Sequence, residues 1–254
     1  MKVTSIQTDL VWENIQANLI HFDKKIEEID AFSDLLILPE MFSTGFTPNA
    51  EKVAENYSGY AFNWLITKAK EKNFAIVASF IFNDEGIFKN RLFFVKPDGQ
   101  FSYYDKRHLF GTTEKDALTA GKERVIVNYK GWRILPLICY DLRFPVWSRN
   151  QNDYDLLIYI ANWPDKRIAH WQTLLKARAI ENQSYTIGLN RIGIDGNGFT
   201  YNGMSMHVSP KGEMLAEAKQ GHECTQTIEL NKSLQDTYRQ FFNVLSDADA
   251  FSVL

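Results

Sequence analysis

Residues 132–145 read WRILPLICYDLRFP, an apolar run that stops at a polar turn. The segment from 134 to 138 predicts a buried strand, because strands covered on both faces are continuously apolar. Cys139 follows directly, where a rigid scaffold would hold its side chain at the rim at which loops and substrates meet. The position makes Cys139 a candidate nucleophile. The alternative is a small core residue, since free cysteines are often buried.

The composition indicates one large globular domain. The chain has 254 residues, enough to bury roughly 70–75% of its unfolded surface. No low-complexity linker marks a boundary, so residues 1–254 are predicted to form a single domain. The balance of 28 Lys and Arg against 31 Asp and Glu, a net charge of −3, favours neither nucleic acid nor an anionic membrane as a partner. A small molecule or another protein is the expected partner.

Cysteine usage and the start of the chain predict a cytoplasmic protein. Cys139 and Cys224 form neither a CxxC motif nor a disulfide-dense spacing. The chain opens on a strand-like segment with no apolar signal region before it. No apolar run reaches the length of about 18 residues that would indicate a transmembrane helix. We therefore expect a soluble protein in a reducing compartment.

Strand-like and helix-like segments alternate along the chain. Many strands, few helices and several hairpins argue for a layered α/β domain with mixed sheets. The helix over 166–182 carries an apolar face suited to a sheet or a partner subunit. The predicted strands are 3–8, 34–38, 74–82, 86–95, 101–104, 125–128, 133–138, 156–160, 185–190, 204–209 and 225–229, and the predicted helices are 14–32, 61–72 and 166–182.

Three ionisable residues follow the ends of predicted strands. They are Glu40, Lys106 and Cys139. If those strands run in the same direction, their side chains converge on one rim, where α/β folds place their sites. A carboxylate within reach could accept the thiol proton as attack begins. A buried ammonium could stabilise the oxyanion that forms.

Each of these residues also has a plainer interpretation. Glu40 alone would be a solvated loop residue, the ordinary place for a glutamate. Lys106 lies in a charged stretch, Asp105 to His108, of the kind that usually forms a solvated turn. Glu40, Lys106 and Cys139 considered together distinguish the catalytic from the structural interpretation better than any one residue does.

Taken together, the segments resemble the nitrilase, or carbon–nitrogen hydrolase, superfamily, whose members use a Glu-Lys-Cys triad. The resemblance covers nearly the whole chain. It is carried, in order, by LPEMF at 38–42, YDKRHLF at 104–110, CYDLRFP at 139–145, NWP at 162–164 and KARAIENQ at 176–183.

The resemblance implies a four-layer α-β-β-α sandwich of two mixed sheets flanked by helices, formed by one carbon–nitrogen hydrolase domain. It also implies dimerisation through helices, so a homodimer or higher homo-oligomer is expected. In family terms Glu40 is the general base, Lys106 stabilises the tetrahedral intermediate, and Cys139 forms a thioester. The backbone N–H of Tyr140 would be a second oxyanion donor. Glu114 matches a second family glutamate and would hold Lys106 and the substrate in place.

The residues of these motifs resemble those of the ω-amidase branch of the superfamily. That branch hydrolyses the terminal amide of 2-oxo dicarboxylic acid monoamides such as 2-oxoglutaramate and 2-oxosuccinamate. Two alternatives stay open: an N-carbamoyl amino acid or aliphatic amide hydrolase, and a non-catalytic metabolite-binding member of the fold. An intact set of Glu40, Lys106 and Cys139 argues against a binding protein.

Arg143, four residues after Cys139, is the candidate for holding the substrate's free carboxylate. A guanidinium is planar and permanently charged, and it matches a carboxylate with two hydrogen bonds. The alternative is that Arg143 only pairs with Asp141 to brace the turn. Apolar walls would come from Phe42, Phe46 and Trp163.

No metal or other cofactor is predicted. The histidines show no HExxH motif and no ligand spacing with the cysteines. Cys224 is expected to take no part in the chemistry. The glycines at 193, 196 and 198 lack the Lys-Ser/Thr and helix start of a phosphate loop, so they predict a turn between strands.

Overall fold

A six-stranded mixed sheet, built mainly from the first half of the chain, is one of two in the computed structural model, which describes residues 1–29 and 32–252. Its order is β14-β1-β2-β3-β4-β5, with β1, β2 and β3 parallel. β14, at one edge, and β4 run antiparallel to their neighbours. The strands are β1 (Lys2–Gln7), β2 (Leu35–Ile37), β3 (Ala75–Asp84), β4 (Ile87–Val95), β5 (Phe101–Asp105) and β14 (Cys224–Glu229).

A second six-stranded sheet faces the first, in the order β13-β12-β9-β8-β7-β6. Its centre, β7, β8 and β9, is parallel. A small hairpin, β10 with β11, stands apart from both sheets. The strands are β6 (Val127–Tyr129), β7 (Trp132–Ile138), β8 (Leu156–Ala161), β9 (Tyr185–Asn190), β10 (Ile192–Ile194), β11 (Thr200–Asn202), β12 (Met206–Val208) and β13 (Met214–Glu217).

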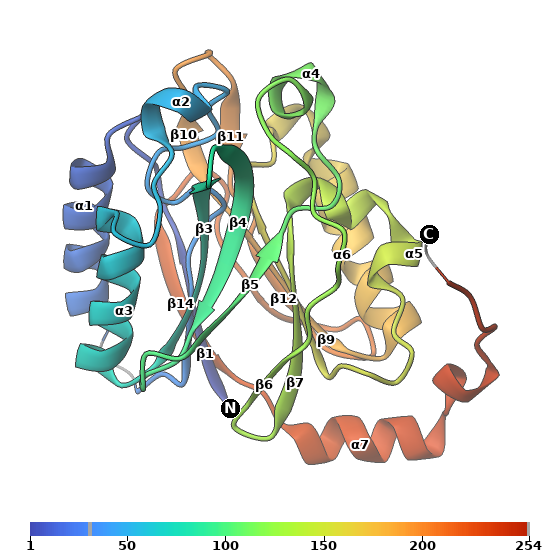
Figure 1. The fold of residues 1–254 in the computed structure, drawn as a ribbon. Helices are drawn as coiled ribbons and strands as arrows, with labels where there is room; N and C mark the ends of the chain where they lie inside the picture. Colours follow the sequence, from blue (N-terminus) through green and yellow to red (C-terminus); the bar gives the residue numbers. More distant parts are fainter. Residues whose placement is uncertain (30–31, 253–254) are drawn as a thin grey trace.

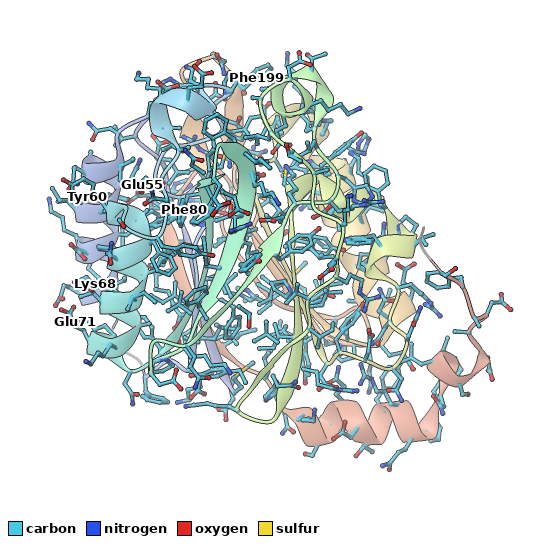
Figure 2. The ribbon with its side chains drawn as sticks, in the orientation of Figure 1. Glu55, Tyr60, Lys68, Glu71, Phe80 and Phe199 are labelled. Carbon is cyan, nitrogen blue, oxygen red and sulfur yellow. The ribbon has the colours of Figure 1, made fainter. Side chains whose placement is uncertain are left out.

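Helices cover the outer faces of the two sheets (Figure 1). α1 (Ile15–Glu27) and α3 (Tyr60–Lys72) lie on the first sheet, and α6 (Ile168–Asn182) lies on the second. Figure 2 shows Tyr60, Lys68 and Glu71 along the outer side of α3. The predicted four-layer sandwich is confirmed. The shorter helices are α2 (Ala50–Val53), α4 (Gly111–Lys115), α5 (Pro145–Ser148) and α7 (Lys232–Phe241), with 3-10 turns η1 (Cys139–Arg143), η2 (Asp165–Arg167) and η3 (Val244–Asp247).

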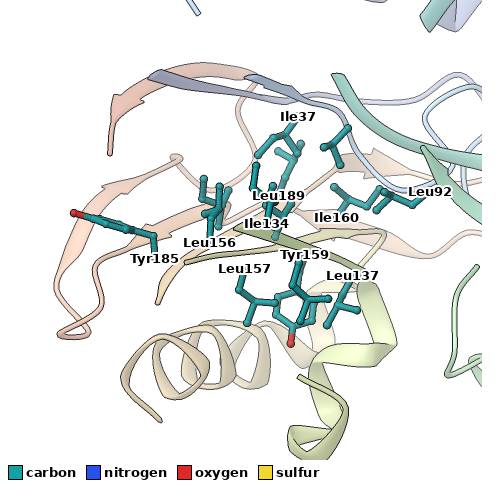
Figure 3. Packing of buried hydrophobic residues seen from close by; sticks show 14 of the residues in the cluster. Ile37, Leu92, Ile134, Leu137, Leu156, Leu157, Tyr159, Ile160, Tyr185 and Leu189 are labelled. Atoms are coloured by element: carbon teal, nitrogen blue, oxygen red, sulfur yellow. The ribbon is translucent and has the colours of Figure 1, made fainter. Parts of the chain in front are cut away.

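The central strands are apolar on both faces because each face is covered. In β2, Leu35 and Ile37 join the core between the sheets, whereas Leu36 faces the layer under α1 and α3. β8 shows the same alternation: Leu156 points toward Ile37 of the first sheet, and Leu157 points toward the helices (Figure 3). Because side chains alternate between the two faces of a strand, each sheet packs against the other sheet on one face and against its helices on the other. The two sheets therefore take part in three packed interfaces.

The apolar face of α6 packs against the second sheet of the same chain. Of the two alternatives in the sequence analysis, a sheet or a partner subunit, the sheet is the one observed. Trp171 and Leu175 are fully buried over Gly188 of β9. A Cβ at Gly188 would lie 2.3 Å from Leu175 Cδ1 and 2.8 Å from Trp171 Cζ2, so only glycine lets helix and sheet approach this closely.

Some predicted boundaries are wrong. The helix predicted over 14–32 ends at Glu27, and residues 30 and 31 of that prediction lie outside the described residues. The helix predicted over 166–182 begins with the 3-10 turn η2. Sequence patterns also missed strands β10, β11 and β13 and helix α7. α7 was missed because few of its side chains are buried, Gln235 being one of them. No helix among the described residues is long and apolar enough to cross a membrane.

Candidate active site

Three strand ends bring Glu40, Lys106 and Cys139 to one place. Glu40 follows β2 and Lys106 follows β5, in the same sheet. β4 runs antiparallel to both β3 and β5, so β5 points the same way as β2 and both carboxyl ends meet one edge. Cys139 follows β7 of the facing sheet. The predicted convergence is confirmed, and the chemical roles stay predictions.

Lys106 is the centre of a buried ion cluster. Its Nζ donates to Glu40 Oε1 at 2.8 Å and to Glu114 Oε2 at 2.7 Å. None of these three residues is more than 1% exposed. Glu114 lies on α4, and its Oε2 also accepts the backbone N–H of Phe110 at 2.7 Å. The predicted contact between Glu114 and Lys106 is present, so Glu114 is no exposed loop carboxylate.

Two asparagines complete the hydrogen bonding of the carboxylates. Asn90, on β4, donates through Nδ2 to Glu40 Oε1 at 2.9 Å and to Glu114 Oε1 at 3.1 Å. The backbone N–H of Asn162 donates to Glu40 Oε2 at 2.8 Å. Sequence reasoning missed Asn90, because a polar residue within a strand carries no signal until its cross-strand neighbours are known. Asn162 had been noted only as part of a turn.

Cys139 occupies a strained junction between β7 and η1. Its φ is +43°, in the left-handed region that non-glycine residues seldom adopt. This conformation turns the chain sharply from a strand into a 3-10 helix, as at other nucleophile-bearing turns. The residue is 7% exposed and reaches the surface through a pocket.

Asp141 holds this junction in place. Its Oδ2 accepts from the Ile138 N–H at 3.0 Å and from the Tyr104 hydroxyl at 2.8 Å, and its Oδ1 accepts from the His108 N–H at 3.1 Å. The Lys106 segment and the Cys139 turn are thereby tied to one carboxylate. The alternative in which Arg143 pairs with Asp141 is wrong, because Asp141 is committed to these other partners.

Electrostatics in the cluster favour a protonated thiol. Burial, and then the charge of Glu40, raises the pKa of Cys139 well above its ordinary value, while Lys106 opposes the change. Burial disfavours the charged form of Lys106, but Glu114 and Glu40 overcompensate and raise its pKa. Burial raises the pKa of Glu114, against the opposing charge of Lys106. A thiol in this setting needs a base to take its proton as it reacts.

A pocket of about 350 Å³ opens beside Cys139. One side is formed by the β10–β11 hairpin, and Phe199 of that hairpin lies at the same end of the molecule as α4 (Figures 1 and 2). The pocket is lined by Phe46, Pro48, Phe110, Thr113, Cys139, Tyr140, Arg143, Asn162, Trp163, Pro164, Arg167, Asn197, Phe199 and Tyr201.

Most of the predicted substrate-contacting residues line this pocket, and one does not. Tyr140, Arg143, Phe46 and Trp163 are part of its wall. The prediction for Phe42 is wrong. Its ring is fully buried in the core beneath α1 and α3, against Phe22, Trp64 and Phe80. The PEMF motif does not reveal which way each aromatic turns after the strand ends.

Sequence reasoning missed a second pocket arginine and the whole hairpin wall. Arg167 precedes α6 and lines the pocket together with Asn197, Phe199 and Tyr201. The glycines at 193, 196 and 198 lie in or beside the β10–β11 hairpin, as the predicted turn between strands required. Nothing in that pattern revealed that the turn reaches the site.

The remaining candidates lie elsewhere. Cys224 begins β14 and does not line the pocket. Within residues 1–29 and 32–252, no group of three or more His, Cys, Asp or Glu side chains is placed to hold a metal ion.

Comparison with known proteins gives matches along nearly the whole chain. The carbon-nitrogen hydrolase family model matches residues 2–240. Omega-amidase YafV of Escherichia coli strain K12 is 47% identical over 253 residues, covering 99% of this chain and 98% of that protein. The 2-oxoglutaramate amidase of Bacillus subtilis is 32% identical, with 85% of each chain covered. A solved CN-hydrolase superfamily protein from Xanthomonas campestris is 38% identical, with a TM-score of 0.94 and 100% and 98% of the chains covered.

Replacing Glu40 by Gln should lower the pKa of Cys139, because the charge of Glu40 raises it and the opposing charge of Lys106 is kept. The test measures the rate of iodoacetamide alkylation against pH in a Cys224→Ser background. We expect the midpoint of the Glu40→Gln profile to move to lower pH. Glu217→Gln, on exposed β13, serves as the control and should not move it. A midpoint that stays in place or rises would contradict the described electrostatics.

Proposed function

Because this chain belongs to the carbon–nitrogen hydrolase family, we propose that it is an ω-amidase. It hydrolyses the terminal amide of 2-oxo dicarboxylic acid monoamides, such as 2-oxoglutaramate and 2-oxosuccinamate, to the dicarboxylate and ammonia. The observation that carries this proposal is Arg143 in the wall of the Cys139 pocket. No carboxylate of residues 1–29 or 32–252 forms an ion pair with Arg143, so its guanidinium is available to a carboxylate of the substrate.

The relatives support the same substrate class. They are named omega-amidase and 2-oxoglutaramate amidase. The first matches this chain from end to end at 47% identity. The bound substrate would place its free carboxylate toward Arg143 and its terminal amide toward Cys139.

Acylation begins when Cys139 Sγ attacks the amide carbon while Glu40 accepts the thiol proton. The raised pKa of Cys139 supports concerted proton removal, because a preformed thiolate is disfavoured. The carbonyl π electrons move to oxygen and give a tetrahedral oxyanion. Glu40 then delivers its proton to the amide nitrogen, the C–N bond breaks, ammonia leaves, and a thioester with Cys139 remains.

Two donors stabilise the oxyanion in this scheme. Lys106 Nζ carries the charge, and the backbone N–H of Tyr140 supplies the second hydrogen bond. Because Lys106 is fixed between Glu40 and Glu114, little reorganisation accompanies the development of charge. Removing one such donor typically costs about 10²–10³ in kcat.

Deacylation reverses the roles of the same groups. Glu40 takes a proton from water as the water oxygen attacks the thioester carbon. The C–S bond then breaks, the sulfur regains the proton, and the dicarboxylate is released. Glu114 and Asn90 act as positioning residues, because each contacts the Glu40–Lys106 pair and neither lines the pocket.

The enzyme is also proposed to be a cytoplasmic homodimer. The family resemblance supports association through helices. Exposed apolar side chains on neighbouring helices, Val146 of α5 and Ile180 of α6, agree with it, being 54% and 51% exposed. Light scattering of the purified protein should give twice the chain mass. A monomer mass at micromolar concentration would contradict the dimer.

A panel assay of ammonia release tests the proposed activity. The substrates are 2-oxoglutaramate, 2-oxosuccinamate, glutamine, an N-carbamoyl amino acid, a neutral aliphatic amide and a nitrile. We expect the highest kcat/KM for the two 2-oxo acid amides, because the neutral amide lacks the carboxylate that Arg143 would bind and the relatives are an omega-amidase and a 2-oxoglutaramate amidase. Cys139→Ala should abolish the release while the thermal unfolding midpoint stays close to that of the parent protein.

Three results would count against the proposal. Highest activity on the N-carbamoyl amino acid or the neutral amide would replace the substrate class with the alternative one. Absence of turnover on every substrate would favour a binding protein. Undiminished turnover by Cys139→Ala would remove the thioester mechanism.

A further inference from the structure

The pocket beside Cys139 holds two guanidiniums and no carboxylate partner for either. Arg143 and Arg167 both line it. Among residues 1–29 and 32–252, neither side chain forms an ion pair with an Asp or Glu. Each lies instead against an aromatic ring: Arg143 Cζ is 4.7 Å from the Trp163 centroid, and Arg167 Cζ is 5.2 Å from the Phe110 centroid.

One tryptophan positions both arginines. The Arg143 guanidinium lies over the Trp163 ring, and Trp163 Nε1 donates to the carbonyl oxygen of Arg167 at 2.8 Å. His170 Nδ1 lies 3.1 Å from Arg143 Nη2 and fixes a second point of that guanidinium. Trp163 itself is buried, so this arrangement is part of the rigid wall of the pocket.

The two positive charges lie within electrostatic reach of one another. Burial, and then the charge of Arg167, lowers the pKa of Arg143. Like charges that face one pocket without counterions favour an anionic ligand. One carboxylate of the ligand can accept two hydrogen bonds from the guanidinium of one arginine. The second guanidinium then remains available to another polar group of the same ligand.

We infer that Arg167 discriminates between substrates by their substituent at position 2. It favours substrates with a 2-oxo group and disfavours those with a 2-ammonium group. This inference rests on the proposed function and names a specificity determinant for it. A 2-oxo oxygen can accept a hydrogen bond from the guanidinium. The protonated amine of an amino acid amide would instead face a like charge, which disfavours its binding.

The test compares three amides with the same chain length. 2-Oxosuccinamate carries a 2-oxo group, asparagine carries a 2-ammonium group, and succinamate carries neither. Each is assayed as a substrate and, where turnover is too slow, as a competitive inhibitor of 2-oxosuccinamate hydrolysis. The variants are Arg167→Gln, Arg167→Lys and Arg143→Gln. Lys166→Gln is the matched control, because Lys166 is exposed in the same 3-10 turn and does not line the pocket.

Arg167→Gln should lower kcat/KM for 2-oxosuccinamate by about 10–100-fold, chiefly through KM, since a hydrogen bond to a charged donor is lost. In the same variant, kcat/KM for asparagine should be unchanged or higher. The preference for 2-oxosuccinamate over asparagine should therefore fall at least tenfold. Arg167→Lys should keep part of the preference, because it keeps the charge. Arg143→Gln should weaken all three amides, because all three have the carboxylate.

Two outcomes would overturn the role of Arg167 while the proposed function stands. One is an equal loss on 2-oxosuccinamate and asparagine in Arg167→Gln. The other is an unchanged preference in a variant that unfolds at the same temperature as the parent protein. Failure of the proposed function is distinguished by the unsubstituted enzyme alone. If that enzyme hydrolyses neither 2-oxo acid amide but hydrolyses another amide of the panel, both proposals fall.

Discussion

The site depends on a lysine ammonium buried between two carboxylates. Lys106 contacts Glu40 and Glu114 where no bulk water reaches them. Such a cluster is stable only when every charge is paired and hydrogen-bonded, and removing one partner typically costs about 3–5 kcal/mol. Asn90, Asn162 and the backbone N–H of Phe110 supply the other donors. Because every charge must be paired and hydrogen-bonded, the positions of the Lys106 ammonium and the two carboxylates are tightly fixed. An oxyanion site needs donors held in such fixed positions.

The two facing sheets meet this requirement by ending their strands at one edge. β2 and β5 deliver Glu40 and Lys106 from one sheet, and β7 delivers Cys139 from the other. Asp141 couples them, because it accepts hydrogen bonds from the Tyr104 hydroxyl on β5 and from the backbone at the end of β7. The apolar core between the sheets excludes water behind the cluster, while the β10–β11 hairpin and Trp163 shape the pocket in front of it.

Sequence reasoning recovered the parts of the site that follow from strand ends. Glu40, Lys106 and Cys139 each follow the end of a predicted strand, and their convergence needs only the direction of the strands. Glu114 required the family resemblance. Asn90 was out of reach, since its role depends on the pairing of β4 with β5 and on a carboxylate 50 residues away. Phe42 was misassigned because a motif fixes the order of residues and not the face to which a ring turns. Arg167 was missed because a basic residue before a helix ordinarily lies in solvent.

In the proposed mechanism, Cys139 carries the acyl group of the substrate during turnover. The direct measurement mixes the enzyme with excess 2-oxosuccinamate, quenches with acid within one turnover, digests with pepsin at low pH, and locates the added mass. We expect an adduct equal to the substrate minus ammonia on the peptide that contains Cys139, and this adduct should disappear as the substrate is consumed. The peptide containing Cys224 should stay unmodified. Ammonia released at the full rate with no acyl group on Cys139, or with the adduct on another residue, would contradict this mechanism.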